Sequence, residues 1–321
     1  MFKNMMNRYY YGKSGQGDYE KDDLPRNRMQ LFWEMLRHRL SGLMMLNLVY
    51  AVIWIPAIIV LGRFAFSLLN LLEATQDPSI LGLEAPLTGE QFMAYFHSSL
   101  LYTLLFMIPC IGITGPATAG LSYVTRNWAR DEHAFAWSDY KDAIKANWKP
   151  ALLNSFITGC VPALVYVCYT FYGQQAQSSF FFLIPQAIVV LMGAIWMMMQ
   201  MYIYPQIVTY TLNYGGVLRN SLLLTIGRLP QTVLFRLITL IPAALFGLAA
   251  WLLPYVPVVL MAFAGYYVLI GFALSRFVTA SFTNGIFDKY INVNIEGAEV
   301  NRGLYKKDEF DEEDEEENIA E

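Results

Sequence analysis

One run of residues without a charged side chain, LSGLMMLNLVYAVIWIPAIIVLG at 40–62, limits the folds that this chain can adopt. About 18 or more successive apolar residues are long enough to cross a bilayer as a helix. Further runs of this kind follow along the chain, of which 56% is hydrophobic and 15% charged. Soluble domains carry about 25% charged residues. The sequence therefore predicts an all-α fold, a polytopic membrane helix bundle with about six transmembrane helices.

The predicted transmembrane helices divide the chain into three regions. The predicted spans are 40–62, 92–114, 149–172, 179–204, 232–253 and 256–278. They lie in a transmembrane helical domain at 31–291. The polar N-terminus, 1–30, is expected to be disordered in the cytoplasm. The remaining region, 292–321, ends in DEFDEEDEEENIAE and is expected to be an acidic cytoplasmic tail.

Basic residues between the spans indicate the orientation of the chain. With six spans, 21 of the 22 Lys and Arg residues fall on one side of the membrane, and Arg63 is the exception. Because cytoplasmic loops carry an excess of Lys and Arg, both termini are expected to lie in the cytoplasm. The predicted protein is a multi-pass membrane protein whose immediate partner is the lipid bilayer.

The segment GPATAGLSYVTRNWAR at 115–130 follows the second span and is predicted to form an amphipathic helix at the inner surface. Pro116 suits the first turn of a helix, where its missing N–H needs no partner. One stripe at helical spacing contains Thr118, Ser122, Arg126 and Arg130, and the opposite stripe contains Ala117, Leu121, Val124 and Trp128. We expect Trp128 at headgroup depth and the arginines facing lipid phosphates or a protein partner.

Two further cytoplasmic amphipathic helices are expected at 138–149 and 215–230, and each has a proline that leads into a span. Surfaces of this type either anchor a bundle at the bilayer or dock a partner, and both interpretations stay open. The candidate partner-contact residues are Gly115, Pro116, Thr118, Arg126, Trp128, Arg130, Lys141, Lys145, Trp148, Arg219, Arg228 and Pro230.

The sequence contains no residue pattern that points to catalysis. Its three histidines lie far apart, and it has neither a Gly-rich nucleotide motif nor a nucleophile with a matching base. Cys110, Cys160 and Cys168 fall in apolar runs, where cysteine usually packs as a small apolar residue. We expect no enzyme activity, no catalytic residues, no cofactor and no metal. Basic residues are also too few for a nucleic-acid partner.

Polar side chains inside the predicted spans support a different class of function. They could line a path for a small neutral solute, and prolines in the spans would permit irregular backbone there. Asp and Glu are absent from the spans, which weakens an interpretation as a proton-driven carrier. The candidate polar residues of the bundle interior are Asn47, Asn154, Ser155, Gln186 and Gln200.

Several stretches resemble the YesL family of bacterial membrane proteins, itself a domain of unknown function. They are GPATAGLSYVTRNWARDE, WSDYKDAIKANWKPALL, LRNSLLLTIGRLP and SFTNGIFDKYIN. The resemblance covers roughly 105–291 and an Asn-Leu-aromatic stretch in the first span. Compared with members of that family, this chain has three segments that look like additions: the N-terminus, the acidic tail and about 50 residues between Pro56 and Pro109. The resemblance implies a bacterial plasma membrane and association with carbohydrate uptake systems of the ATP-binding-cassette (ABC) kind.

The leading hypothesis is a non-enzymatic accessory or regulatory protein of such an uptake system. Its cytoplasmic amphipathic helices would contact the ABC permease or ATPase subunits. The alternatives are a transporter or channel for a small neutral solute in its own right, and a membrane sensor. The sequence leaves the substrate and the oligomeric state open.

Overall fold

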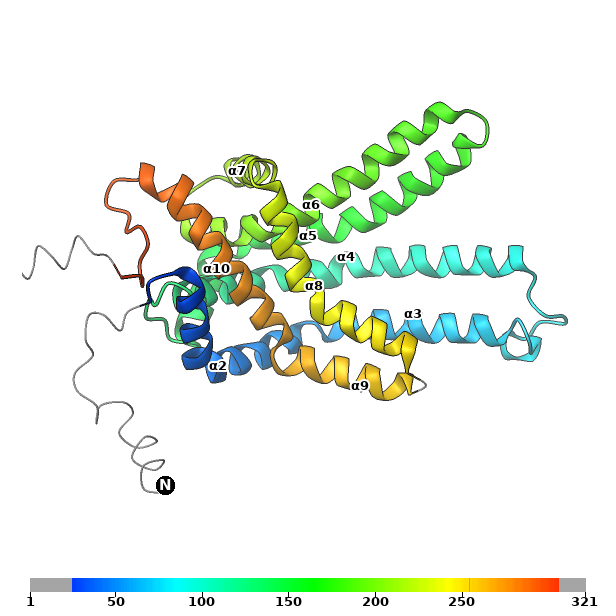
Figure 1. Cartoon of the computed structure of the whole chain (residues 1–321). Helices are drawn as coiled ribbons and strands as arrows, with labels where there is room; N and C mark the ends of the chain where they lie inside the picture. The colour runs from blue at the N-terminus through cyan, green and yellow to red at the C-terminus, as the bar shows by residue number, and fades with distance from the viewer. Residues whose placement is uncertain (1–24, 254, 306–321) are drawn as a thin grey trace, which may run out of the picture.

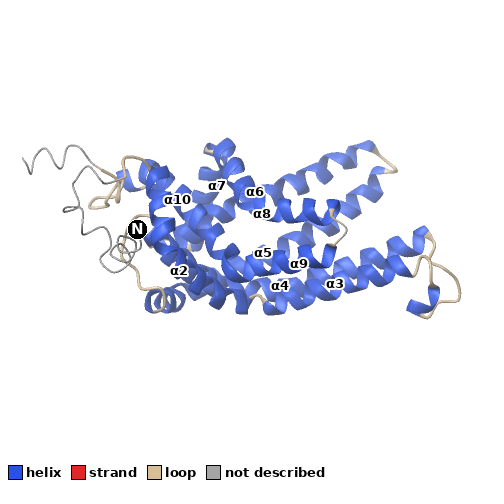
Figure 2. Ribbon diagram, turned by 60° about the horizontal axis from the view of Figure 1, so that its bottom comes forward, coloured by secondary structure: helices blue, strands red, loops and turns tan. Residues whose placement is uncertain are grey.

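The computed structural model describes residues 25–253 and 255–305, and every regular element within these ranges is a helix (Figure 2). Long helices form hairpins that extend from one shared end of the molecule (Figure 1). Six helices are long and apolar enough to cross a membrane, which confirms the predicted number of spans. The two ends of the described chain meet, because the N–H of Tyr305 donates to the carbonyl of Pro25 at 3.0 Å. We call this end the terminal end and the opposite end the hairpin end.

The first predicted span, 40–62, is not a single helix. Helix α2 (Arg28–Ile53) stops before Trp54, and α3 (Ile55–Glu73) continues from there. Pro56 lies in the first turn of α3, where its lack of an N–H favours a helix start. Helix α2 begins with Asn27, whose side chain accepts from the N–H groups of Met29 and Gln30. The predicted disorder is therefore wrong for residues 25–30, and residues 1–24 lie outside the described part.

Helix α4 (Gly89–Trp128) follows a 3₁₀ turn, η2 (Pro78–Leu81), and begins at a capping box formed by Thr88 and Gln91. It runs without interruption through Pro109 and Pro116. The prediction that Pro116 starts a separate surface helix is wrong. A proline removes only one backbone hydrogen bond in mid-helix, and packing against neighbouring helices makes this tolerable.

Helix α5 (Ser138–Ala176) also joins a predicted surface helix to a span, through Pro150 and Pro162. Glycines bring α4 and α5 close together. A Cβ on Gly115 would lie 2.3 Å from the carbonyl oxygen of Ala151, and one on Gly159 would lie 2.9 Å from that of Ile108. Close backbone contact through small residues is a common way for membrane helices to pack. The short turn η3 (Phe180–Phe182) leads into α6 (Leu183–Thr209), which completes the hairpin.

Helix α7 (Tyr214–Gly227) lies across the bundle and is seen along its axis in Figure 1. The next helix, α8 (Leu229–Leu252), has Pro230 in its first turn, as expected for a proline that leads into a span. After α9 (Val256–Tyr266) comes a π-helical segment, η4 (Tyr267–Gly271). Helix α10 (Phe272–Tyr290) and the turn η5 (Asn292–Asn294) return the chain to the terminal end.

The main apolar core lies toward the terminal end, where α2, α4 and α10 pack together. Its fully buried side chains include Leu43, Leu46, Leu121 and Phe277. Toward the hairpin end, large apolar side chains are exposed, such as Phe181 and Trp251 at 76% and 80%. Exposed apolar and aromatic side chains on spanning helices are suited to contact lipid and the membrane interface.

Candidate functional site

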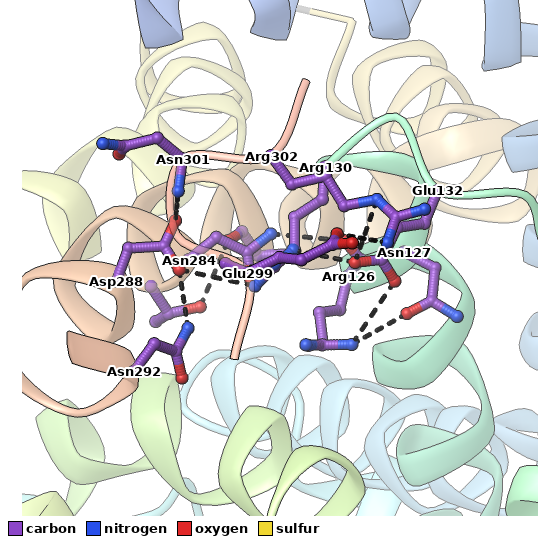
Figure 3. Close-up of polar contacts among 12 residues, drawn as sticks. Arg126, Asn127, Arg130, Glu132, Asn284, Asp288, Asn292, Glu299, Asn301 and Arg302 are labelled. Atoms are coloured by element: carbon purple, nitrogen blue, oxygen red, sulfur yellow. Dashed lines mark hydrogen bonds and ion pairs between the residues drawn. The ribbon is translucent and has the colours of Figure 1, made fainter. Parts of the chain in front are cut away.

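A buried group of polar side chains connects three parts of the chain at the terminal end (Figure 3). Its centre is Asp288 on α10, whose side chain is 3% exposed. The Asp288 carboxylate accepts from Arg28 Nη2 at 2.7 Å, from Arg130 Nη1 at 3.4 Å and from Asn292 Nδ2 at 2.6 Å. It also accepts from the backbone N–H of Asn301 at 3.2 Å. We call Asp288 and these four partners the Asp288 cluster.

The Asp288 cluster extends to the segment after α10. Arg130 donates from Nη2 to the carbonyl of Glu299 at 2.8 Å, and its Nε lies 2.9 Å from Glu132 Oε1. Arg302 forms an ion pair with the Glu299 side chain at 2.5 Å. Residues 292–305, the first part of the predicted acidic cytoplasmic tail, are thus folded against the bundle. The acidic residues after 305 lie outside the described part.

Tyr210, at the end of α6, contacts the same cluster. Its hydroxyl donates to Asn292 Oδ1 at 2.7 Å. Burial raises the pKa of Tyr210 to about 12, partly offset by the positive charge of Arg126. Tyr210 is therefore a neutral hydrogen-bond donor at physiological pH. Its hydrogen bond to Asn292 connects the end of α6 to the turn that follows α10.

The predicted outward stripe on 115–130 is buried instead. Thr118, Ser122 and Arg130 are 2%, 3% and 5% exposed, and Arg126 is mostly covered. The opposite stripe is buried as well, because α2, α5, α6 and α10 all pack against this part of α4. Arg130 is stable there because its charge is paired with Glu132 and Asp288. The expectation that these arginines face lipid or a partner is wrong.

Trp128 is also buried, at 2% exposure, rather than placed at headgroup depth. Its indole Nε1 donates to the carbonyl of Ala134 at 3.0 Å, which closes the turn between α4 and α5. Gly42 of α2 lies against the ring, where an added Cβ would come within 2.7 Å. The guanidinium of Arg39 lies 5.8 Å from the ring centroid. Trp128 therefore serves as a packing residue between α2 and α4.

Other predicted contact residues do lie on the surface. Lys141, Lys145 and Trp148 on α5 are exposed, and so is Arg219 on α7. Arg228 is half-buried, with its guanidinium 4.7 Å from the centroid of the Tyr290 ring. We call Lys141, Lys145 and Arg219 the basic surface.

A groove of about 270 Å³ lies between α5 and the connection from α6 to α7. Asn147 and Pro150 line it from α5, and Tyr210, Leu212 and Tyr214 line it from the other side. Asn147 is two residues from Lys145, so the two side chains point to different sides of α5, and the groove lies beside the basic surface rather than within it. A side chain from another protein could enter this groove.

The predicted polar interior residues form helix-to-helix hydrogen bonds. Asn154 Nδ2 donates to Gln200 Oε1 at 2.9 Å, and the hydroxyl of Tyr214 donates to Asn154 Oδ1 at 3.2 Å. Ser155 shares a hydrogen bond of 2.5 Å with Tyr204. These contacts bring Asn154, Ser155 and Gln200 together between α5 and α6. Polar contacts of this kind hold membrane helices together.

Asn47 and Gln186 lie apart from that group. Asn47 donates to the carbonyls of Tyr267 and Val268 at 2.7 Å each, and its Oδ1 accepts from the N–H of Ala273 at 2.8 Å. It therefore satisfies backbone groups in and beside the π-helical segment. Gln186 donates to the carbonyl of Tyr169 at 3.1 Å, near the hairpin end. The five residues do not form one continuous path.

The sequence interpretation missed Asp288, the centre of the cluster, and Asn284, which lies beside the cluster on α10. Asn284 and Asp288 are four residues apart, so they share one face of α10, and Asn284 donates to the carbonyl of Arg126 at 3.2 Å. The available signal was an isolated acidic residue within SFTNGIFDKY, close to the end of an apolar helix. Such a residue usually has a partner.

The fold and these contacts define a multi-pass integral membrane protein with a polar, internally bonded terminal end. Residues 93–169 match the model of a family described as a protein of unknown function, DUF624. The match covers α4 after its first turn and most of α5, the pair that packs through Gly115 and Gly159. No curated protein matches the chain, and no solved structure matches it.

Proposed function

We propose that this protein is a non-enzymatic accessory component of a carbohydrate ABC uptake system in a bacterial plasma membrane. In this proposal the terminal end faces the cytoplasm and the basic surface contacts permease or ATPase subunits. The observation that carries the proposal is the exposure of Lys141, Lys145 and Arg219, with a groove beside α5. The carbohydrate part rests on the resemblance to the YesL family.

Ion pairing distinguishes this surface from the buried arginines nearby. The only carboxylate within ion-pair distance of the basic surface, among the described residues, is Asp142, 3.4 Å from Lys145. Both of these side chains are more than 70% exposed, so solvent screens their attraction. Lys145 is therefore available to a carboxylate of another protein. By contrast, Arg28 and Arg130 already have buried acidic partners.

Aromatic side chains on the same part of α5 support a protein contact. Trp137 and Trp148 are each 47% exposed, and the ammonium groups of Lys141 and Lys149 lie 5.1 and 5.6 Å from their respective ring centroids. Tryptophan is enriched among the residues that dominate binding energy at protein interfaces. An acidic partner surface with an apolar side chain for the groove would complement this face.

Charge reversal on the basic surface tests the proposal. The variant K141E/K145E would be purified in mild detergent with the ABC permease and ATPase from its own bacterium. The matched control, R37E/K289E, reverses two exposed basic residues on α2 and α10 at the same end of the molecule. We expect the wild type and the control to retain the transporter subunits and K141E/K145E to lose them. The proposal fails if K141E/K145E retains the subunits as well as the control does, or if the wild type does not bind them.

One observation favours the alternative of a solute pathway. Within the buried group between α5 and α6, Gln200 Nε2 has no hydrogen-bond partner among the described residues. A polar atom of this kind could contact a neutral solute that passes between the helices. Flux of radiolabelled monosaccharides into proteoliposomes that contain only this protein tests the idea. Flux that is lost in N154A/Q200A would support a transporter, and flux equal to that of empty vesicles would exclude one for these solutes.

A further inference from the structure

Helices α6, α8 and α10 meet near the terminal end, where their side chains form one apolar cluster. The hydroxyls of Tyr202 on α6 and Thr232 on α8 share a hydrogen bond of 2.7 Å. Phe235 on α8 stacks on Phe282 of α10, with ring centroids 4.0 Å apart. These contacts fix the three helices relative to one another. Arg236, the neighbour of Phe235, projects from this junction.

Two arginines lie against α6 at this junction. Arg236 donates from Nη2 to the carbonyl of Met197, while its buried Nε has no hydrogen-bond partner in the described part of the chain. The guanidinium of Arg276 lies 5.0 Å from the centroid of the Tyr204 ring. Met197 and Tyr204 are seven residues apart, about 10 Å along a helix. Seven residues are almost two full helical turns, so the two arginines lie against the same side of α6.

Neither Arg236 nor Arg276 has a carboxylate within ion-pair distance among residues 25–253 and 255–305. Within the described part of the chain, the acceptors that they contact are one backbone carbonyl and one aromatic ring. In the Asp288 cluster, by contrast, both Arg28 and Arg130 are paired with an acidic side chain. Two neighbouring cations next to apolar helices are costly unless an anion compensates them. The chain itself supplies no such anion in its described part.

The depth of this arginine pair identifies the class of anion. Arg236 is in the second turn of α8, and Arg276 is in the second turn of α10, after the π-helical segment. Phe277, next to Arg276, packs on Phe32 in the second turn of α2, and Phe235, next to Arg236, stacks on Phe282. Both arginines therefore lie toward the terminal end, the level at which long basic side chains reach lipid phosphates. A guanidinium presents a planar fork of N–H donors that matches the oxygens of a phosphate group.

We infer that Arg236 and Arg276 together bind the phosphate group of an anion from outside the chain. The phosphate can belong to an anionic lipid headgroup of the adjacent leaflet or to a free phosphate in solution. Tyr204 holds Arg276 in place through its ring, and Met197 holds Arg236 through its carbonyl. The buried Nε of Arg236 has no acceptor among the described residues, so the guanidinium charge is only partly compensated. This inference does not depend on the proposed transporter partner.

Binding assays on the full chain in detergent test the site. Native mass spectrometry would measure retention of phosphatidylglycerol against phosphatidylcholine, and melting curves would measure stabilisation by inorganic phosphate. We expect each of R236Q and R276Q to weaken phosphate-group binding by about tenfold, as is typical for losing one charge-assisted interaction. The matched control R37Q removes an exposed arginine from α2 and should bind like the wild type.

The lipid-retention assay and the melting assay together distinguish the source of the phosphate. Selective retention of phosphatidylglycerol identifies a lipid site, and stabilisation by inorganic phosphate alone identifies a soluble ligand. The charge-conserving variant R236K/R276K should keep more binding than R236Q/R276Q, which separates loss of the site from loss of the fold. The inference is overturned if the wild type binds neither probe, if R236Q/R276Q binds as tightly as the wild type, or if R37Q loses as much binding.

Discussion

Replacing Asp288 with Asn should destabilise the terminal end more than any other single charge removal. Removing one partner of a buried ion pair costs about 3–5 kcal/mol. Asp288 is 3% exposed, but Arg28 is one-third exposed and Arg130 keeps Glu132 at 2.9 Å. We therefore expect the lower limit, about 3 kcal/mol. In a domain of this size that lowers the melting temperature by about 6–12 °C.

Thermal unfolding in detergent, followed by the amount of monodisperse protein left after heating, measures this loss. The matched control is D142N, because Asp142 is 71% exposed and pairs only with exposed Lys145. D142N should lower the melting temperature by no more than about 2 °C. D288N should also make trypsin cut faster at Arg302, since Asp288 accepts from the backbone of Asn301. Equal melting of D288N and D142N would refute the role assigned to the Asp288 cluster.

Two further substitutions test the packing of the helices. N47L should lower stability by about 3 kcal/mol, because three buried backbone groups at the π-helical segment lose their partner. The exposed control N294L should melt like the wild type, and equal melting of the two variants would contradict the role of Asn47. G115A should lower stability by about 1–3 kcal/mol, since its Cβ would overlap the backbone of α5. G247A, where the new Cβ would meet open space, should show no loss, and a G115A variant as stable as G247A would show that α4 and α5 have room to separate.

The membrane-spanning helices could be predicted from the sequence because their requirement is local. A helix that crosses lipid needs a long apolar run, and such runs are visible without any tertiary information. The break at Trp54 has a local cause too, since Pro56 marks a helix start. That proline lies inside a continuous apolar run, so hydropathy alone joined α2 and α3 into one span.

The burial of Arg130 could not be predicted, because it depends on residues far along the chain. A stripe of Thr, Ser and Arg indicates a solvent-facing side when a helix has one buried face. Helix α4 is instead surrounded by other helices at this point, and Asp288, 158 residues away, compensates the charge. The π-helical segment could not be predicted either, because its hydrogen-bond partner Asn47 is 220 residues away in the sequence.

One physical reason explains why the basic residues of α5 are exposed while those at the end of α4 are covered. Lys141 and Lys145 have long side chains and only an exposed acidic neighbour, so they remain at the surface. The arginines at 126 and 130 lie beside Glu132, which allows them to be buried. Spacing along a helix does not distinguish these two situations.

Labelling of single cysteines on opposite ends of the bundle tests the membrane topology most directly. In a chain whose three native cysteines are replaced by alanine, Q76C would mark the connection at the hairpin end and K145C the terminal end, both at exposed positions. A membrane-impermeant thiol reagent should label Q76C in intact cells and K145C only after the membrane is permeabilised. Labelling of K145C in intact cells, or equal labelling of both positions, would contradict six crossings with the terminal end in the cytoplasm.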